Sequence, residues 1–303
     1  MAENQELWKE AILSLKEKKR ALILAHNYQI PEVQDVADFV GDSLELSLQA
    51  QKTDRDLIVF CGVYFMAEVA RILSGKRVLM PVRGAGCPLA NMASKEKVLK
   101  MKEQFPRSAI VTYINSSAEV KAISDVICTS ANALRIVELI PQEEVIFVPD
   151  QGLGGWVKEN SRKTVHLFPG FCPTHFRLMA EDILKARALH PEAKVLVHPE
   201  CRPEVRKLAD QVLGTGGMLK FAKKDPSGSF IIGTEEGLIY RLKKENPEKE
   251  FFLASPLLLC PNMKKTDAVA LLNCLKDETG EVEVPMEVAS RARKSLLRML
   301  ELS

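Results

Sequence analysis

Residues 21–43, ALILAHNYQIPEVQDVADFVGDS, carry a pattern that the chain repeats without a gap at residues 108–130 and 193–215. In each copy an apolar run typical of a buried strand leads into a polar cluster. The cluster begins at His26, Tyr113 or His198, which we take as the first position of the repeat. Six, seven, twelve and seventeen residues later, every copy carries glutamate, valine, aspartate, and serine or threonine. We therefore infer that the chain contains three copies of one structural unit.

The similarity continues beyond these stretches. A further apolar run follows in each copy, at residues 57–60, 145–147 and 230–232, and another at residues 78–80, 165–168 and 251–253. Just past the last run of each copy stands a Cys-Pro pair, which begins at Cys87, Cys172 or Cys260. Three of the seven cysteines therefore occupy one place in the repeat, and the other four do not.

Within a copy, a helix is expected directly after the polar cluster. Pro31 and Pro203 suit a first helical turn, and the glutamate that follows each one complements the helix dipole. Strands that alternate with helices form a parallel sheet covered on both faces. We predict an α/β fold of three repeated α/β/α sandwich units around a pseudo-threefold axis, with the active site at the centre.

The predicted units cover residues 1–105, 106–190 and 191–303. The first unit includes an amphipathic N-terminal helix at residues 6–18, and the third ends in a helix at residues 288–302. The packing of the units around an axis is an inference from the repeat.

Composition excludes several classes of protein. The chain has 303 residues and a net charge of +2, with charges of both signs interspersed, so we expect no nucleic-acid partner and no membrane-surface patch. The N-terminus has no apolar core and no cleavage site of a signal peptide. No stretch reaches the roughly 18 apolar residues of a membrane span. We therefore expect a cytoplasmic protein without a membrane partner.

The cysteines suggest a metal centre. An odd number of cysteines spread over a long cytoplasmic chain argues against a disulfide framework. If the three units surround an axis, Cys87, Cys172 and Cys260 converge on it. Three thiolates from distant segments suit one 4Fe–4S cluster in which one iron has no protein ligand. That open iron can act as a Lewis acid on a substrate hydroxyl or carboxylate.

Other readings of the cysteines remain open at this stage. Structural zinc usually takes four ligands, often from Cys-x-x-Cys pairs, which this sequence lacks. Free cysteine is also commonly a small buried hydrophobe, so the three residues would then only begin buried loops. Cys201 follows Glu200 and is a candidate fourth ligand, although the other units have no counterpart. Cys61, Cys128 and Cys274 lie in or beside apolar runs and are interpreted as packing residues.

Polar residues follow the first strand of each unit. Residues two apart on a strand share a face, so six side chains could line the central cavity. They are His26, Tyr113 and His198 at the first position, and Tyr28, Asn115 and Glu200 two residues later. These residue types perform general acid–base catalysis. At the next strand end stand Ser43, Ser130 and Thr215. They are either ordinary helix caps or groups that bind a carboxylate or phosphate.

Several long motifs, in order, resemble the quinolinate synthase family, the A protein of de novo NAD biosynthesis. The motifs are AHNYQIPEVQDVADFVGDSLELS, YINSSAEVKAISDVICTSANA, GFCPTH, HPECRPEV, GTGGM, IIGTEEGLIYRLKKENP and LCPNMKK, at residues 25–265, with RMLEL at residues 298–302. The resemblance implies three similar α/β/α domains and one 4Fe–4S cluster held by three cysteines. It also implies a reaction that condenses iminoaspartate (iminosuccinate) with dihydroxyacetone phosphate, giving quinolinate, phosphate and water.

The resemblance also implies roles for individual residues. Cys87, Cys172 and Cys260 match the cluster ligands. The residues that match substrate-binding positions are His26, Ser43, Tyr113, Asn115, Ser130, His198, Glu200 and Thr215. Tyr28 matches a residue near the reacting triose, and Glu200, with Tyr28 and His26, would move protons. A functional link to an aspartate-oxidising enzyme is a further implication.

Departures from the family pattern and rival families bear on these implications. Tyr64 is interpreted as the counterpart of Asp150 and Glu235, and Thr174 stands where an aliphatic residue is expected. The chain also lacks the C-terminal cysteines of some longer members. Diphthamide-synthesis proteins and the terminal isoprenoid reductase also place three cysteines on three α/β units, but HPEC and CTSANA favour quinolinate synthase. A zinc-stabilised sensor or binding module is the non-enzymatic alternative.

Overall fold

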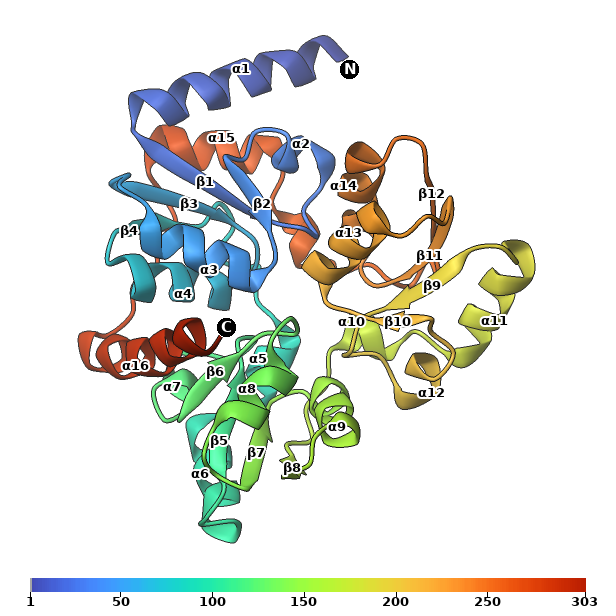
Figure 1. The fold of residues 1–303 in the computed structure, drawn as a ribbon. Coiled ribbons are helices and arrows are strands. Elements are labelled where there is room, and N and C mark those ends of the chain that lie inside the picture. The colour runs from blue at the N-terminus through green and yellow to red at the C-terminus, as the bar shows by residue number, and fades with distance from the viewer. Residues whose placement is uncertain (1) are drawn as a thin grey trace.

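The computed structural model describes residues 2–303, which form three parallel four-stranded sheets around a common centre (Figure 1). Each sheet has the same strand order, in which the first strand of the unit lies second. Unit 1 has the order β2 (Phe39–Gly41), β1 (Ala21–His26), β3 (Leu57–Cys61) and β4 (Arg77–Leu79). Unit 2 has β6 (Val126–Cys128), β5 (Ala109–Tyr113), β7 (Glu144–Val148) and β8 (Thr164–Leu167). Unit 3 has β10 (Gln211–Val212), β9 (Lys194–Val197), β11 (Ser229–Gly233) and β12 (Glu250–Leu253). The predicted α/β class with three repeated units is confirmed.

The helices repeat in the same order as the strands. Before the first strand of each unit come α1 (Ala2–Lys18), α6 (Lys95–Gln104) and α11 (Ala180–Leu189). After it come the short helices α2 (Pro31–Gln34), α7 (Ala118–Lys121) and α12 (Pro203–Arg206). The second strand leads to α3 (Ser43–Lys52), α8 (Ala133–Leu139) and α13 (Thr215–Lys224), and the third to α4 (Tyr64–Ser74), α9 (Gln151–Asn160) and α14 (Gly237–Glu245). The N-terminal helix is thus the first element of the repeat rather than an addition to it.

Short helices follow the Cys-Pro pairs. They are α5 (Pro88–Met92), α10 (Pro173–Phe176) and a 3₁₀ turn, η1 (Met263–Lys265). In α5 and α10 the proline occupies the first turn, where its missing N–H leaves no hydrogen bond unmade. None of the helices within residues 2–303 combines the length and the apolar composition needed to cross a bilayer.

Two helices close the chain, and neither stays with unit 3 (Figure 1). Helix α15 (Ala268–Asp277) packs on α1 and α2 of unit 1. Helix α16 (Met286–Leu302) packs on α4 of unit 1 and on α7, α8 and β6 of unit 2. The C-terminal segment therefore joins the first two units, although the boundaries predicted from the repeat assign it to the third. Those boundaries remain a prediction.

The two faces of each sheet belong to different apolar clusters. Successive strand residues point to opposite faces. On the inner faces one continuous cluster includes residues of all three sheets, among them Leu24, Val111 and Leu196. Their neighbours Ile23 and Val195 belong instead to separate outer clusters. The shared inner cluster is the apolar contact that holds the three units together.

The repeated aspartate has the same structural role in every unit. Its carboxylate accepts the backbone N–H of a residue near the start of the first strand, and its own N–H donates to the carbonyl of that residue. The carboxylate bonds are Asp38 to Ile23 (2.8 Å), Asp125 to Ile110 (2.7 Å) and Asp210 to Val195 (2.7 Å). The return bonds measure 2.9, 3.0 and 2.9 Å. The repeat therefore conserves the link between its first two strands.

Replacing one of these aspartates tests that role. Asp125→Ala leaves the Ile110 N–H without its acceptor, so the free energy of unfolding should fall by about 1 kcal/mol. Asp125→Asn is the matched control because it keeps a side-chain oxygen. Urea unfolding followed by circular dichroism measures both. Equal loss in the two variants, or none in the alanine variant, would contradict the assignment.

Candidate active site and metal centre

A cavity lies where loops from all three units meet. It is lined by every residue that the sequence analysis selected for the site. These are His26, Tyr28, Ser43, Cys87, Tyr113, Asn115, Ser130, Cys172, His198, Glu200, Thr215 and Cys260. Ligands of parallel α/β sheets bind outside the carboxyl ends of the strands, and this cavity has that position for three sheets at once. The structure brings the predicted residues together, while their individual roles remain a prediction.

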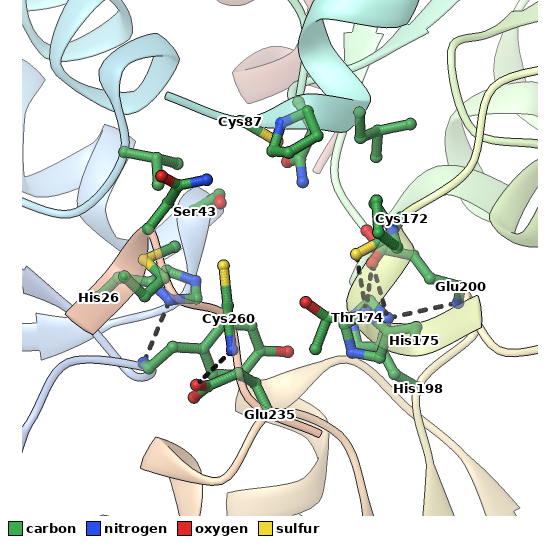
Figure 2. A pocket seen from close by; sticks show the side chains of 18 of the residues that line it. His26, Ser43, Cys87, Cys172, Thr174, His175, His198, Glu200, Glu235 and Cys260 are labelled. Atoms are coloured by element: carbon green, nitrogen blue, oxygen red, sulfur yellow. Dashed lines mark hydrogen bonds and ion pairs between the residues drawn. The ribbon is translucent and has the colours of Figure 1, made fainter. Parts of the chain in front are cut away.

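The three Cys-Pro cysteines come from three different units. Figure 2 shows Cys87, Cys172 and Cys260 around the same space, with a sulfur atom on each. The candidate fourth ligand, Cys201, is instead buried in the outer apolar cluster of unit 3, and its Sγ lies 3.5 Å from the carbonyl oxygen of Gly233. It is not among the residues that line the cavity.

Two buried carboxylates hold the cysteine loops. Asp150 accepts the backbone N–H of Cys172 at 3.0 Å, and Glu235 accepts that of Cys260 at 3.1 Å. Each acid stands two residues after the third strand of its sheet, at equivalent places. Glu235 also pairs with Lys264, whose Nζ lies 3.0 Å from Oε1. The repeat thus supplies a support beneath the Cys-Pro cysteine in units 2 and 3.

The assignment of Tyr64 as the unit 1 counterpart of these acids is wrong by one residue. The backbone N–H of Tyr64 donates to the carbonyl of Ala85, which stands two residues before Cys87. In the other units the equivalent bonds to the residue two before the Cys-Pro cysteine come from Gln151 and Glu236, which follow Asp150 and Glu235. Val63 therefore occupies the carboxylate position in unit 1. Val63, Asp150 and Glu235 also stand at the same distance from the first repeat position of their units.

The thiols fit a bound cation. Burial raises the pKa of Cys87 to about 12, and it also raises the pKa values of Cys172 and Cys260. Without a cation these sulfurs are protonated, whereas thiolates are the form that ligates metal. A second set of candidate metal ligands consists of Cys172, His175 and Glu200. Each of these residues offers one ligand atom, and the three atoms lie within 4.8 Å of one another. Both groups share Cys172.

Glu200 is the centre of a buried polar cluster. His175 Nδ1 lies 2.6 Å from Glu200 Oε2 and 3.2 Å from Cys172 Sγ, and the two side chains are almost fully buried. Burial acts to raise the pKa of Glu200, but the neighbouring His175 and hydrogen bonds from His175 and Tyr113 outweigh it and lower the pKa. The carboxylate is therefore ionised in the folded protein.

Two buried oxygen atoms at the cavity have no partner within the described chain. They are Oε1 of Glu200 and Oδ1 of Asn115. A buried acceptor without a hydrogen bond is costly in a native structure and commonly marks the place of a ligand, an ion or water. Both residues line the cavity, so a ligand there could supply the missing donors or cations.

The two histidines at the first repeat position share one geometry. His26 Nδ1 accepts the N–H of Tyr28 at 3.2 Å, and His198 Nδ1 accepts the N–H of Glu200 at 3.3 Å. Burial lowers the pKa of each histidine to about 3. Both rings are thus neutral, with the proton on Nε2. The 3.8 Å contact between His198 and Glu200 is consequently not an ion pair.

The hydroxyl residues lie at or near helix N-termini. Ser43 and Thr215 are the first residues of α3 and α13, and both line the cavity. Asn27 donates to Thr215 Oγ1 at 2.9 Å, and Arg241 donates to Asn27 at 2.8 Å. The start of α13 has no side-chain cap, so its N–H groups and helix dipole can attract an anion, whereas at α3 the Asp42 carboxylate already accepts the N–H groups of Leu44 and Glu45 at 2.9 Å.

The glycines of the GTGG cluster allow a close approach between units. A Cβ at Gly214 would lie 2.7 Å from Ser130 Oγ, and a Cβ at Gly216 would lie 2.5 Å from Asp42 Oδ2. The start of α13 therefore touches units 1 and 2 at points where only glycine fits.

Sequence reasoning missed several residues of the site. Asp150 and Glu235 could have been found, since they share one repeat position. His175 follows Cys172 by three residues on α10, which puts both on one side of the helix. Thr174, the departure from the family pattern, lines the cavity and hydrogen-bonds to Cys260. Thr234 hydrogen-bonds to Tyr28 and His175 of the other two units, and such contacts between units leave no signal in the repeat.

The fold and the site define an α/β protein of three pseudo-symmetric units with a candidate metal centre between them. A family model described as quinolinate synthetase A protein matches residues 10–301. The chain is 51% identical over 295 residues to a quinolinate synthase of Thermodesulfovibrio yellowstonii, covering 97% of each chain. It is 52% identical over 297 residues to a quinolinate synthase of Caldicellulosiruptor saccharolyticus, covering 97% of this chain and 98% of the relative. The chain belongs to the quinolinate synthetase A protein family, and the resemblance found in the sequence is confirmed.

The buried neutral histidines predict a dependence of stability on pH. An unfolded histidine has a pKa of 6.5 against about 3 in the fold, so between these values the unfolded chain binds more protons. The free energy of unfolding should therefore decrease as the pH is lowered through this window, by up to about 1.4 kcal/mol per pH unit for each histidine.

Urea unfolding near pH 7 and near pH 5 measures this effect. His26→Gln should show a weaker dependence on pH than the unmodified protein, since one of the two histidines is gone. His190→Gln leaves both buried histidines in place and is the control. The same pH dependence in His26→Gln as in the unmodified protein would refute the assignment.

Proposed function

We propose that this protein is a quinolinate synthase, which condenses iminoaspartate with dihydroxyacetone phosphate to give quinolinate, phosphate and water. The observation that carries the proposal is the central cavity, where three cysteines from three units meet a cluster of buried acid–base groups. Relatives with about half of their residues identical over nearly the full length carry this name. Iminoaspartate must be supplied by oxidation of aspartate, which implies a functional link to an aspartate-oxidising enzyme.

The proposed cofactor is one 4Fe–4S cluster held by Cys87, Cys172 and Cys260. The donor set supports it, because three sulfur ligands suit iron–sulfur chemistry better than a single hard cation. When bound, the cluster supplies a Lewis-acidic iron to a substrate oxygen. In this reading His175 and Glu200 are not ligands. Instead, His175 lies close enough to hydrogen-bond to the Cys172 sulfur, as groups around metal ligands commonly do.

The anionic groups of the substrates are proposed to bind at the hydroxyl residues. Ser43, Ser130 and Thr215 line one cavity at or near helix starts, and Thr215 is oriented by Asn27. A phosphate or carboxylate there would accept hydrogen bonds from the hydroxyl groups and, at the uncapped start of α13, from backbone N–H groups as well. Tyr113 and Asn115 are the remaining binding groups, and the unpaired Asn115 oxygen accepts a donor of the substrate.

We assign proton transfer to Glu200, His26 and Tyr28, each of which has a defined protonation state. Glu200 is ionised and can accept a proton at its carboxylate. His26 is neutral and presents Nε2–H as its donor, while burial raises the pKa of Tyr28, so that its phenol keeps its proton. These three residues thus offer one proton acceptor and two hydrogen-bond donors to a substrate in the cavity.

Cysteine variants test the cluster. Cys87→Ala, Cys172→Ala and Cys260→Ala should each lose the iron, the sulfide and quinolinate formation. Cys128→Ala, a buried cysteine of β6 outside the cavity, is the control and should keep all three. Iron and sulfide analysis after anaerobic purification, with an assay for quinolinate, gives the result. Full activity of Cys87→Ala, or zinc without sulfide in the unmodified protein, would refute the proposal.

Glu200→Gln separates a base from a metal ligand. If Glu200 moves protons, kcat should fall by about 100-fold or more while the iron content stays unchanged. If Glu200 instead ligates a single ion with Cys172 and His175, the variant should lose the metal. Glu204→Gln changes a half-exposed glutamate of the same unit and is the control, with unchanged activity and metal.

A further inference from the structure

Thr234 joins two site residues without touching the cavity. It directly follows β11 in unit 3, is fully buried, and is not among the residues that line the cavity. Its Oγ1 lies 2.6 Å from the hydroxyl of Tyr28 and 2.8 Å from Nε2 of His175. Tyr28 belongs to unit 1, and His175 to the loop and helix that follow the sheet of unit 2. One hydroxyl therefore connects groups from all three units.

Thr234 extends the hydrogen bond that joins His175 to Glu200. The Glu200 carboxylate only accepts, so His175 Nδ1, at 2.6 Å, must carry the proton. On the other side of the ring, Nε2 lies within hydrogen-bond distance of Thr234 Oγ1, which also reaches the hydroxyl of Tyr28. One hydroxyl therefore contacts both the ring of His175 and the phenol of Tyr28.

The backbone of Tyr28 is held by other contacts. Its N–H donates to His26 Nδ1 at 3.2 Å, and its carbonyl accepts from Lys264 Nζ at 2.9 Å. A Cβ at Gly237 would lie 2.7 Å from this carbonyl, so the segment also fits tightly against α14. Loss of the Thr234 hydroxyl would therefore free the phenol ring of Tyr28 while leaving its backbone in place.

We propose that Thr234 is a positioning residue for the condensation reaction, because its hydroxyl holds in place both the phenol of Tyr28 and the ring of His175, which bonds to Glu200. The inference rests on the proposed function. Thr234 itself does not line the cavity and acts through its two partners.

Thr234→Val and Thr234→Ser test the inference in the holoenzyme. Valine keeps the shape and removes the hydroxyl, so kcat should fall at least tenfold, with KM within about twofold of the unmodified value. Serine keeps the hydroxyl and should restore kcat to within about threefold. Iron and sulfide content, and the Kd of quinolinate measured by anaerobic calorimetry, should stay unchanged in both. Thr266→Val is the control, because this buried threonine has no side-chain hydrogen bond within the described chain and lies outside the cavity.

A double-mutant cycle shows whether Thr234 acts through Tyr28. In the Tyr28→Phe background, Thr234→Val should lower kcat by no more than about twofold, because the phenol that it orients is absent. Full additivity of the two effects, no rescue by serine, or an unchanged kcat in Thr234→Val would overturn the inference. Failure of the unmodified holoenzyme to form quinolinate would instead refute the proposed function, so the two failures are distinguishable.

Discussion

The site depends on one geometric constraint, which is that the carboxyl ends of three parallel sheets open onto the same space. Parallel strands bring the loops that follow them to one edge of a sheet. Because the inner faces of the three sheets share one apolar cluster, these edges cannot move apart independently. Residues separated by more than 80 positions in the chain, such as Cys87 and Cys172, therefore reach the same cavity.

Burial then imposes a second requirement, because polar groups at the centre of three packed units must find partners or a ligand. Many of them do so across unit boundaries. Asn27 of unit 1 donates to Thr215 of unit 3, and Lys264 donates to the Tyr28 carbonyl. The acceptors that remain unpaired, on Glu200 and Asn115, lie at the cavity. Some of the hydrogen bonds that join the units thus also shape the site.

The repeat made much of the fold predictable from sequence. Equal spacing from the first repeat position is enough to find the strands and the repeated aspartate, and the Cys-Pro pair marks the three cysteines, although its distance from that position varies by up to three residues. Spacing is not enough to place α15 and α16, because only the packed structure shows that α15 lies on unit 1 and that α16 joins units 1 and 2. The Thr234 hydrogen bonds are hidden for the same reason. They join three units, whereas the repeat reports only what is common within one.

The side chains depart from threefold symmetry at the repeat positions that line the cavity. The first repeat position carries histidine in units 1 and 3 but Tyr113 in unit 2, and only Glu200, two positions later in unit 3, is a carboxylate. Three identical acids around one axis would repel one another and share protons, so that none would have a defined charge. With one acid at these positions instead of three, Glu200 stays ionised, the His26 ring is neutral and the Tyr28 phenol keeps its proton. Symmetry in the backbone therefore brings the groups together, and asymmetry in the side chains gives them different protonation states.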